Sequence, residues 1–92
     1  MEHRYLVTLE ERHGEYEINQ YQCVWADTLA AAREKATNLA REWYVYADDD
    51  EEMTTIYPGV FFFNCGEVAV SVRAVEQYDD DHELLRRLRL AR

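Results

Sequence analysis

The sequence predicts an α+β fold: an antiparallel sheet of four or five strands, one long helix packed on a face, and a short C-terminal helix. Three observations predict it. Alternating apolar and polar residues mark strands, apolar residues at three- and four-residue spacing mark a helix, and short links between strand pairs favour antiparallel hairpins. Because the chain has 92 residues, we expect one domain spanning 1–92.

The first two strands form the first predicted hairpin. Residues 5–9 alternate, so that the odd members share a face, and Gly14 supplies the turn. In the strand 16–26 the apolar residues fall first at even and then at odd positions. We expect either a β-bulge near Asn19 and Gln20 or a strand whose two faces are both partly covered.

The most regular segment of the chain predicts a helix from Leu29 to Trp43 or Tyr44. Asp27 or Thr28 should cap its first turn, since both side chains can accept a bond from a free backbone N–H. An apolar stripe marks the side that should face the sheet, and it consists of Leu29, Ala32, Ala36, Leu39, Ala40 and Trp43.

The second half of the chain predicts further strands and a last helix. Residues 53–57 are a candidate short strand before a Pro-Gly turn, residues 60–63 form the next strand, and residues 64–67 form a hairpin turn. Asp80 and Glu83 resemble a capping box that opens the last helix. The strand after the hairpin turn should direct four apolar side chains to one face: Val68, Val70, Val72 and Ala74.

Residue types that support catalysis or metal binding are few and scattered. Cys23 and Cys65 stand alone, and no two histidines have the spacing of a helical zinc site. The single serine, Ser71, has no flanking glycines, and three scattered glycines cannot build a phosphate-binding loop. We therefore predict no enzyme, no cofactor and no metal site. Both cysteines should be reduced, unpaired, strand-borne and buried.

Charge is the most informative feature for function. Nineteen acids against ten bases give a formal net charge of −9, which repels nucleic acid and anionic membranes. No apolar stretch approaches the length of a membrane span and no secretion signal is evident, so we expect a cytoplasmic protein. The acids concentrate in two clusters, namely Asp48, Asp49, Asp50, Glu51 and Glu52, and Asp79, Asp80, Asp81 and Glu83.

Two interpretations of these clusters remain open. They either serve as solvated loop and cap residues that keep a small protein in solution, or they form a negative surface that binds a basic groove. Tyr44 and Tyr46 are candidate interface residues because tyrosine buries area at low entropic cost, and the alternative is packing under the following loop. The predicted partner is a protein or ribonucleoprotein with a basic nucleic-acid-binding groove.

In size, charge and strand-strand-helix-strand order the chain resembles the small acidic α+β proteins of phages and mobile elements, among them several anti-CRISPR proteins. No functional residue transfers through this resemblance. It implies an inhibitor that blocks a nucleic-acid-handling complex, sterically or by mimicking nucleic acid.

Residues 5–43 also resemble HicB-type antitoxins, whose helix opens with Asp-Thr-Leu, here Asp27-Thr28-Leu29. The Pro-Gly and Gly-Cys elements that such proteins usually carry before that helix are missing here. The alternative function is therefore an antitoxin-like or regulatory protein-interaction module.

The C-terminal helix suggests a second kind of contact. Its apolar residues could pair with a second copy to give a homodimer, or pack against the sheet of the same chain. The residues concerned are Leu84, Leu85, Leu88 and Leu90.

Overall fold

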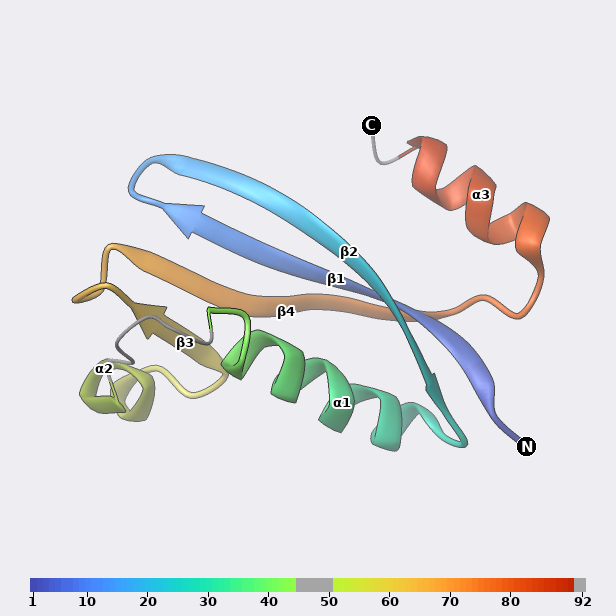
Figure 1. The fold of residues 1–92 in the computed structure, drawn as a ribbon, viewed down its shortest axis with the longest axis horizontal. Coiled ribbons are helices and arrows are strands. Elements are labelled where there is room, and N and C mark those ends of the chain that lie inside the picture. The colour runs from blue at the N-terminus through green and yellow to red at the C-terminus, as the bar shows by residue number, and fades with distance from the viewer. Residues whose placement is uncertain (45–50, 91–92) are drawn as a thin grey trace.

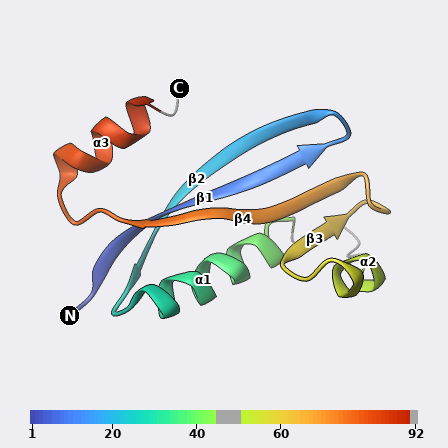
Figure 2. The same ribbon diagram turned by 180° about the vertical axis from the view of Figure 1, so that it is seen from behind.

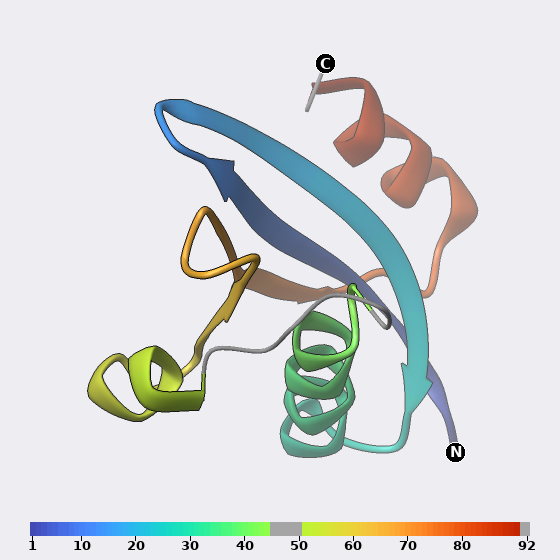
Figure 3. The same cartoon turned by 60° about the vertical axis from the view of Figure 1, so that its left-hand side comes forward.

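The computed structural model describes residues 1–44 and 51–90, and of Glu51, Glu52 and Leu90 it describes the backbone alone. Four antiparallel strands form one sheet in the order β2-β1-β4-β3, which confirms the α+β class. Helix α1 lies along one face of the sheet and α3 lies on the other side (Figures 1 and 3). The strands are β1 (His3–His13), β2 (Tyr16–Ala26), β3 (Val60–Phe63) and β4 (Val68–Gln77), and the helices are α1 (Leu29–Arg41), α2 (Glu51–Ile56) and α3 (Asp81–Leu90).

The first hairpin is longer than its sequence suggested, because β1 continues to His13 and only Gly14 and Glu15 form the turn. Gly14 has a φ of 60°, as the first central residue of a type II′ turn requires. The register of β2 with β1 runs unbroken from Tyr16 to Ala26, so the bulge expected near Asn19 and Gln20 is absent.

The phase shift in β2 follows from its place at the edge of the sheet. Val24 and Ala26 pack toward α1, whereas Tyr21 is half-buried on the opposite face. Both faces of the strand are therefore partly covered, which was the second of the two alternatives.

The irregularity lies in the central strand β4 instead. Thr8 pairs with Ala74 and Leu9 pairs with Val72, so that Arg73 is an extra residue in the ladder between β1 and β4. This bulge switches the phase of the strand. Val72, just before the bulge, and Val75, after it, both pack on the core. Ala74 lies on the opposite face with Thr8. The expectation that Ala74 shares a face with Val72 is wrong.

Helix α1 begins where the sequence indicated and ends earlier. The Thr28 hydroxyl oxygen accepts the backbone N–H of Ala31 at 3.1 Å, so Thr28 is the cap. The helix ends at Arg41 rather than at Trp43 or Tyr44. A helix continued to 44 would turn one of these two aromatic rings toward water, whereas the turn after Arg41 packs both against the core.

A helix replaces the short strand expected at residues 53–57. Helix α2 lies beside β3, and the N–H of Tyr57 donates to the C=O of Met53 at 2.9 Å (Figure 1). A strand here would need a partner for its backbone groups, whereas a helical turn satisfies them internally. The Pro58-Gly59 turn follows as predicted, with Gly59 at a φ of 85° and Val60 N–H donating to Tyr57 C=O at 3.2 Å.

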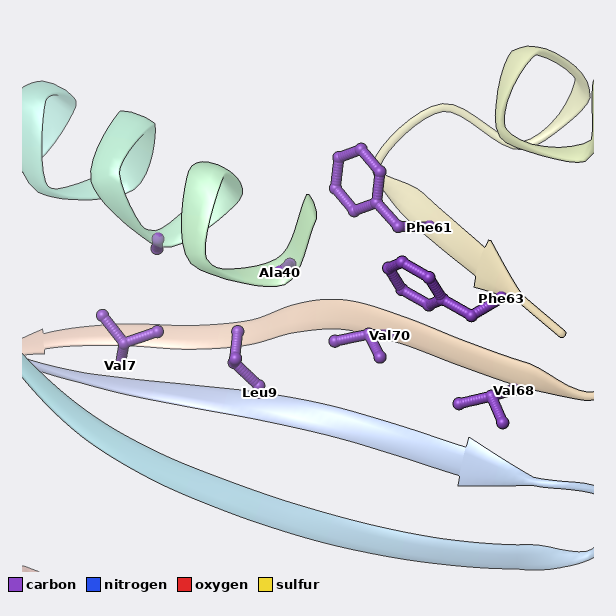
Figure 4. Close-up of a cluster of buried hydrophobic side chains, with 8 residues drawn as sticks. Val7, Leu9, Ala40, Phe61, Phe63, Val68 and Val70 are labelled. Atoms are coloured by element: carbon purple, nitrogen blue, oxygen red, sulfur yellow. The ribbon is translucent and has the colours of Figure 1, made fainter. Parts of the chain in front are cut away.

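The hydrophobic core fills the space between α1 and the sheet (Figure 4). Strands β1, β3 and β4 supply its larger side chains, and α1 supplies alanines that let the helix backbone approach closely. Its buried members include Val7, Leu9, Ala36, Ala40, Phe61, Phe63, Val68 and Val70.

Both cysteines are free, but the expectation that they are buried is wrong. Cys23 lies on the edge strand β2 and is exposed. Cys65 is exposed in the turn between β3 and β4, where it has a φ of 58°. An edge strand and a tight turn leave a side chain little to pack against, which outweighs the usual preference of cysteine for the interior.

Candidate functional site

Most of the first acidic cluster lies outside the described residues. Asp48, Asp49 and Asp50, together with Tyr46, belong to the segment 45–50. Glu51 and Glu52 form the first turn of α2, beside β3.

The second acidic cluster joins β4 to α3, and its first member is engaged within the chain. Oδ1 of Asp79 accepts the backbone N–H of Arg4 at 3.1 Å. Oδ2 lies 2.7 Å from Nε2 of Gln77 and 3.1 Å from Nδ1 of His3. The bond from Gln77 and then the bond from Arg4 hold the pKa of Asp79 below its usual value. Asp79 therefore fastens the start of β1 to the end of β4.

The other three members of this cluster differ in how far they are engaged. Oδ1 of Asp80 accepts the N–H of Glu83 at 3.1 Å, which confirms Asp80 as the cap of α3. Oδ1 of Asp81 lies 2.6 Å from Nη2 of Arg4, although the Asp81 side chain is 80% exposed. Glu83 is exposed and lines a shallow hollow of about 230 Å³ with Tyr78, Arg86 and Arg87. These three carboxylates remain accessible to a partner.

A network of three side chains ties α3 to β4 beside this hollow. The Tyr78 hydroxyl donates to Oε2 of Glu76 at 3.0 Å, and Oε1 of Glu76 lies 3.2 Å from Nη2 of Arg87. Burial, and then the bond to Glu76, raises the pKa of Tyr78 above its ordinary value of 10.0. The bond to Glu76 likewise raises the pKa of Arg87.

The structure does not bring the described parts of the two acidic clusters together. Helices α2 and α3, which begin within them, lie at opposite ends of a domain whose longest dimension is 40 Å (Figures 1 and 2). The sequence shows the two clusters but contains no signal for this separation, because it depends on the strand order.

Tyr44, a candidate interface residue, packs within the fold. Its ring meets Phe63 edge-on, with the ring centroids 5.4 Å apart, and its hydroxyl lies 3.4 Å from Nε2 of His13. The same His13 nitrogen lies 2.9 Å from Oε1 of Glu11, whose second oxygen accepts a bond from Gln20 at 3.2 Å. The half-buried Tyr44 thus joins a polar cluster at one end of the core, which also contains His13, Glu11 and Gln20.

Sequence reasoning missed Glu11, which is only 4% exposed. One signal could have found it, since alternation places Glu11 on the same face as Val7 and Leu9. A carboxylate at a core position needs hydrogen-bond partners, and His13 and Gln20 provide them. These contacts give Glu11 a structural role.

The apolar residues of α3 differ in how far they are buried. Leu84 is buried and Leu88 is half-buried, whereas Leu85 is 54% exposed. The side chain of Leu90 lies outside the description. Packing against the same chain therefore accounts for Leu84 and leaves Leu85 available.

Within residues 1–44 and 51–90, no three His, Cys, Asp or Glu side chains gather into a group that could hold a metal ion. No helix in this part of the chain is long and apolar enough to cross a membrane. Comparison with family models, with curated proteins and with solved structures gives no match.

Proposed function

We propose that the chain is a cytoplasmic protein-binding inhibitor, of the anti-CRISPR kind, that occupies the basic groove of a nucleic-acid-handling complex. It acts without catalysis, either as a steric block or as a mimic of nucleic acid. The observation that carries the proposal is the position of the described acidic residues: α2, which begins with Glu51 and Glu52, and the cluster of Asp79, Asp80, Asp81 and Glu83 lie at opposite ends of a 40 Å domain. The alternative is an antitoxin-like or regulatory protein-interaction module.

The dimensions of the domain suit a groove built for nucleic acid. One turn of duplex DNA spans about 34–36 Å, so a 40 Å body that carries acidic residues can contact basic side chains over a similar length of groove. Such contacts steer association and select the partner more than they add affinity. Binding should therefore weaken as the salt concentration rises.

Several basic side chains of the domain are already paired within the chain. Four arginines lie within ion-pair distance of carboxylates of the same chain, so they do not form a free basic surface. The shortest contacts are Arg4 to Asp81 at 2.6 Å, Arg12 to Glu10 at 2.9 Å, Arg73 to Glu17 at 3.1 Å and Arg87 to Glu76 at 3.2 Å. Because the chain also has a net charge of −9, a basic protein is favoured as the partner.

The test begins with affinity capture of partners from the host cell. One variant then removes two charges at the second cluster by Asp80→Asn and Glu83→Gln, because asparagine also caps a helix. Asp79 is left unchanged since it fastens β1 to β4. A second variant carries Asp48→Asn and Asp49→Asn.

The matched control carries Glu34→Gln and Glu42→Gln at exposed positions on and just after α1, and it changes the net charge by the same amount. We expect at least one cluster variant to bind the captured partner roughly three- to tenfold more weakly, with the control unchanged. A partner that handles no nucleic acid, bound equally well by both cluster variants at physiological salt, contradicts the proposal and favours the regulatory alternative.

A further inference from the structure

The outer edge of β2 has backbone groups that the sheet does not use. Arg4, the register partner of Trp25, donates its N–H to Asp79 and accepts the N–H of Tyr78 at its C=O, so its backbone faces away from β2. Trp25 must then turn its own amide groups outward, and its C=O indeed accepts a bond from Lys35. By alternation, the residues that also turn their N–H and C=O outward are Glu17, Asn19, Tyr21 and Cys23.

This edge lacks the features that usually prevent strands from pairing. The segment 16–26 contains no proline and no basic residue, and its register with β1 has no bulge. Its single charge, on Glu17, lies within 3.1 Å of Arg73 and 3.6 Å of Arg12. In the described part of the chain, Lys35 bonds to this edge at its Trp25 end. Three large apolar side chains of β2 are exposed, namely Tyr16 at 78%, Ile18 at 48% and Trp25 at 50%.

We propose that β2 pairs antiparallel with β2 of a second copy, across a two-fold axis at Tyr21, so that two sheets of four strands become one of eight. Outward-facing residues must oppose outward-facing residues, which restricts the possible registers. With the axis at Tyr21, Asn19 of each copy opposes Cys23 of the other. The amide groups of these three positions then supply the central hydrogen bonds.

The strand is self-complementary in this register. On the α1 side of the sheet Ile18 opposes Val24, and Gln20 opposes Gln22, so apolar residues meet apolar residues and amides meet amides. Glu17 opposes Trp25 and stays far from its own copy. A strand that matches its own reverse in this way fits a second copy of this chain better than an unrelated strand.

Net charge opposes this association, which gives the pairing a distinctive salt dependence. Two copies at −9 each repel, whereas the paired segment 18–24 carries no charge. Added salt screens the repulsion and leaves the backbone bonds almost unaffected. Self-association should therefore strengthen with salt, whereas the binding of an acidic surface to a basic groove should weaken.

The first measurement is sedimentation equilibrium of the full chain at about 0.05 M and 0.5 M salt. We expect a mass approaching twice 11.0 kDa as concentration rises, at lower concentration in the higher salt. Cys23→Pro removes an outward N–H without touching the ladder to β1, whereas the control Cys23→Thr keeps that N–H. The proline variant should raise the dimer dissociation constant roughly tenfold or more, since symmetry removes two bonds.

The second measurement tests the register by disulfide formation in a Cys65→Ser background. Asn19→Cys should cross-link to Cys23 of a second copy, because opposed residues have Cα atoms about 5.5 Å apart. The two positions are about 13 Å apart within one strand, so the bond cannot form inside a chain. Glu17→Cys is the control, since it meets Cys23 only if the strands are shifted.

A dimer that strengthens with salt, is weakened by Cys23→Pro alone and cross-links at position 19 supports the pairing. A chain that stays monomeric at every concentration and salt overturns it. Equal association of the proline and threonine variants also overturns it, as does cross-linking at position 17 in place of 19. Thermal unfolding of each variant shows whether the fold is retained, and the cross-linking result does not depend on the proline variant.

Discussion

Replacing Ala36 with leucine should test how closely α1 lies on the sheet. Ala36 is completely buried and packs within the cluster that contains Val7 and Phe63. Leucine would add three carbon atoms to a site with no free space, so the helix must shift or the neighbours must leave their preferred rotamers. Such overpacking costs about 1–3 kcal/mol. The whole domain should have a free energy of unfolding of roughly 5–14 kcal/mol, so the loss would be large.

Thermal unfolding followed by circular dichroism measures the effect. A loss of about 2 kcal/mol corresponds to a drop in Tm of roughly 8–16 °C for a domain of this size. Ala30→Leu is the matched control, since it makes the same change at an exposed position of α1 and should alter stability by no more than about 0.5 kcal/mol. Equal melting temperatures for the two variants would show that the alanine side of α1 does not face the core.

Three further predictions concern titration and reactivity. The pKa of Asp79 is depressed in the folded state, so its carboxylate stabilises the fold above about pH 3.8 and this stabilisation is lost as pH falls through the folded pKa. Urea denaturation at stepped pH should therefore show Asp79→Asn less stable than the parent near neutrality and equal to it in strong acid. Because burial and the bond to Glu76 raise the pKa of Tyr78, ultraviolet titration should show Tyr78 ionising above pH 10.0, and Glu76→Gln should lower that pKa. Cys23 and Cys65 should both react with a thiol reagent in the native protein, since both are exposed.

Local signals in the sequence predicted the hairpins and the starts of α1 and α3. A turn depends on a few adjacent residues, so Gly14 and the Pro58-Gly59 pair could be recognised without knowledge of the sheet. The caps Thr28 and Asp80 are local for the same reason. The end of α1 was not predictable in this way, because it depends on where Trp43 and Tyr44 pack.

Features that depend on the strand order could not be read from the sequence. Val72, Ala74 and Val75 are all apolar, so the alternation in β4 does not reveal that the phase changes at Arg73. Residues 53–57 include strand-forming threonine and isoleucine, yet they lie in and just after helix α2.

The candidate site shows the same limit. The charge of the second cluster was evident, but its partners His3 and Arg4 come from the other end of the chain. Only the pairing of β1 with β4 brings them to Asp79 and Asp81. Asp79 and Asp81 therefore link the two ends of the chain as well as carrying charge.

The attachment of α3 to the sheet gives a last prediction. Beyond its cap, the helix is held by buried Leu84, by the ion pair of Arg87 with Glu76 and by that of Asp81 with Arg4. Because these contacts are few, Leu84→Ala should release α3 locally rather than unfold the domain. Hydrogen exchange should show the amides of α3 exchanging at least about tenfold faster, while those of β1 are unchanged.

Leu85→Ala is the control, because the same truncation at a side chain that is 54% exposed removes little packing. It should leave exchange in α3 unchanged. The same variant also separates two routes to a dimer, since pairing through β2 does not involve Leu85, whereas pairing through the leucines of α3 does. If light scattering shows that Leu85→Ala abolishes self-association while Cys23→Pro preserves it, α3 and not β2 is the contact between copies.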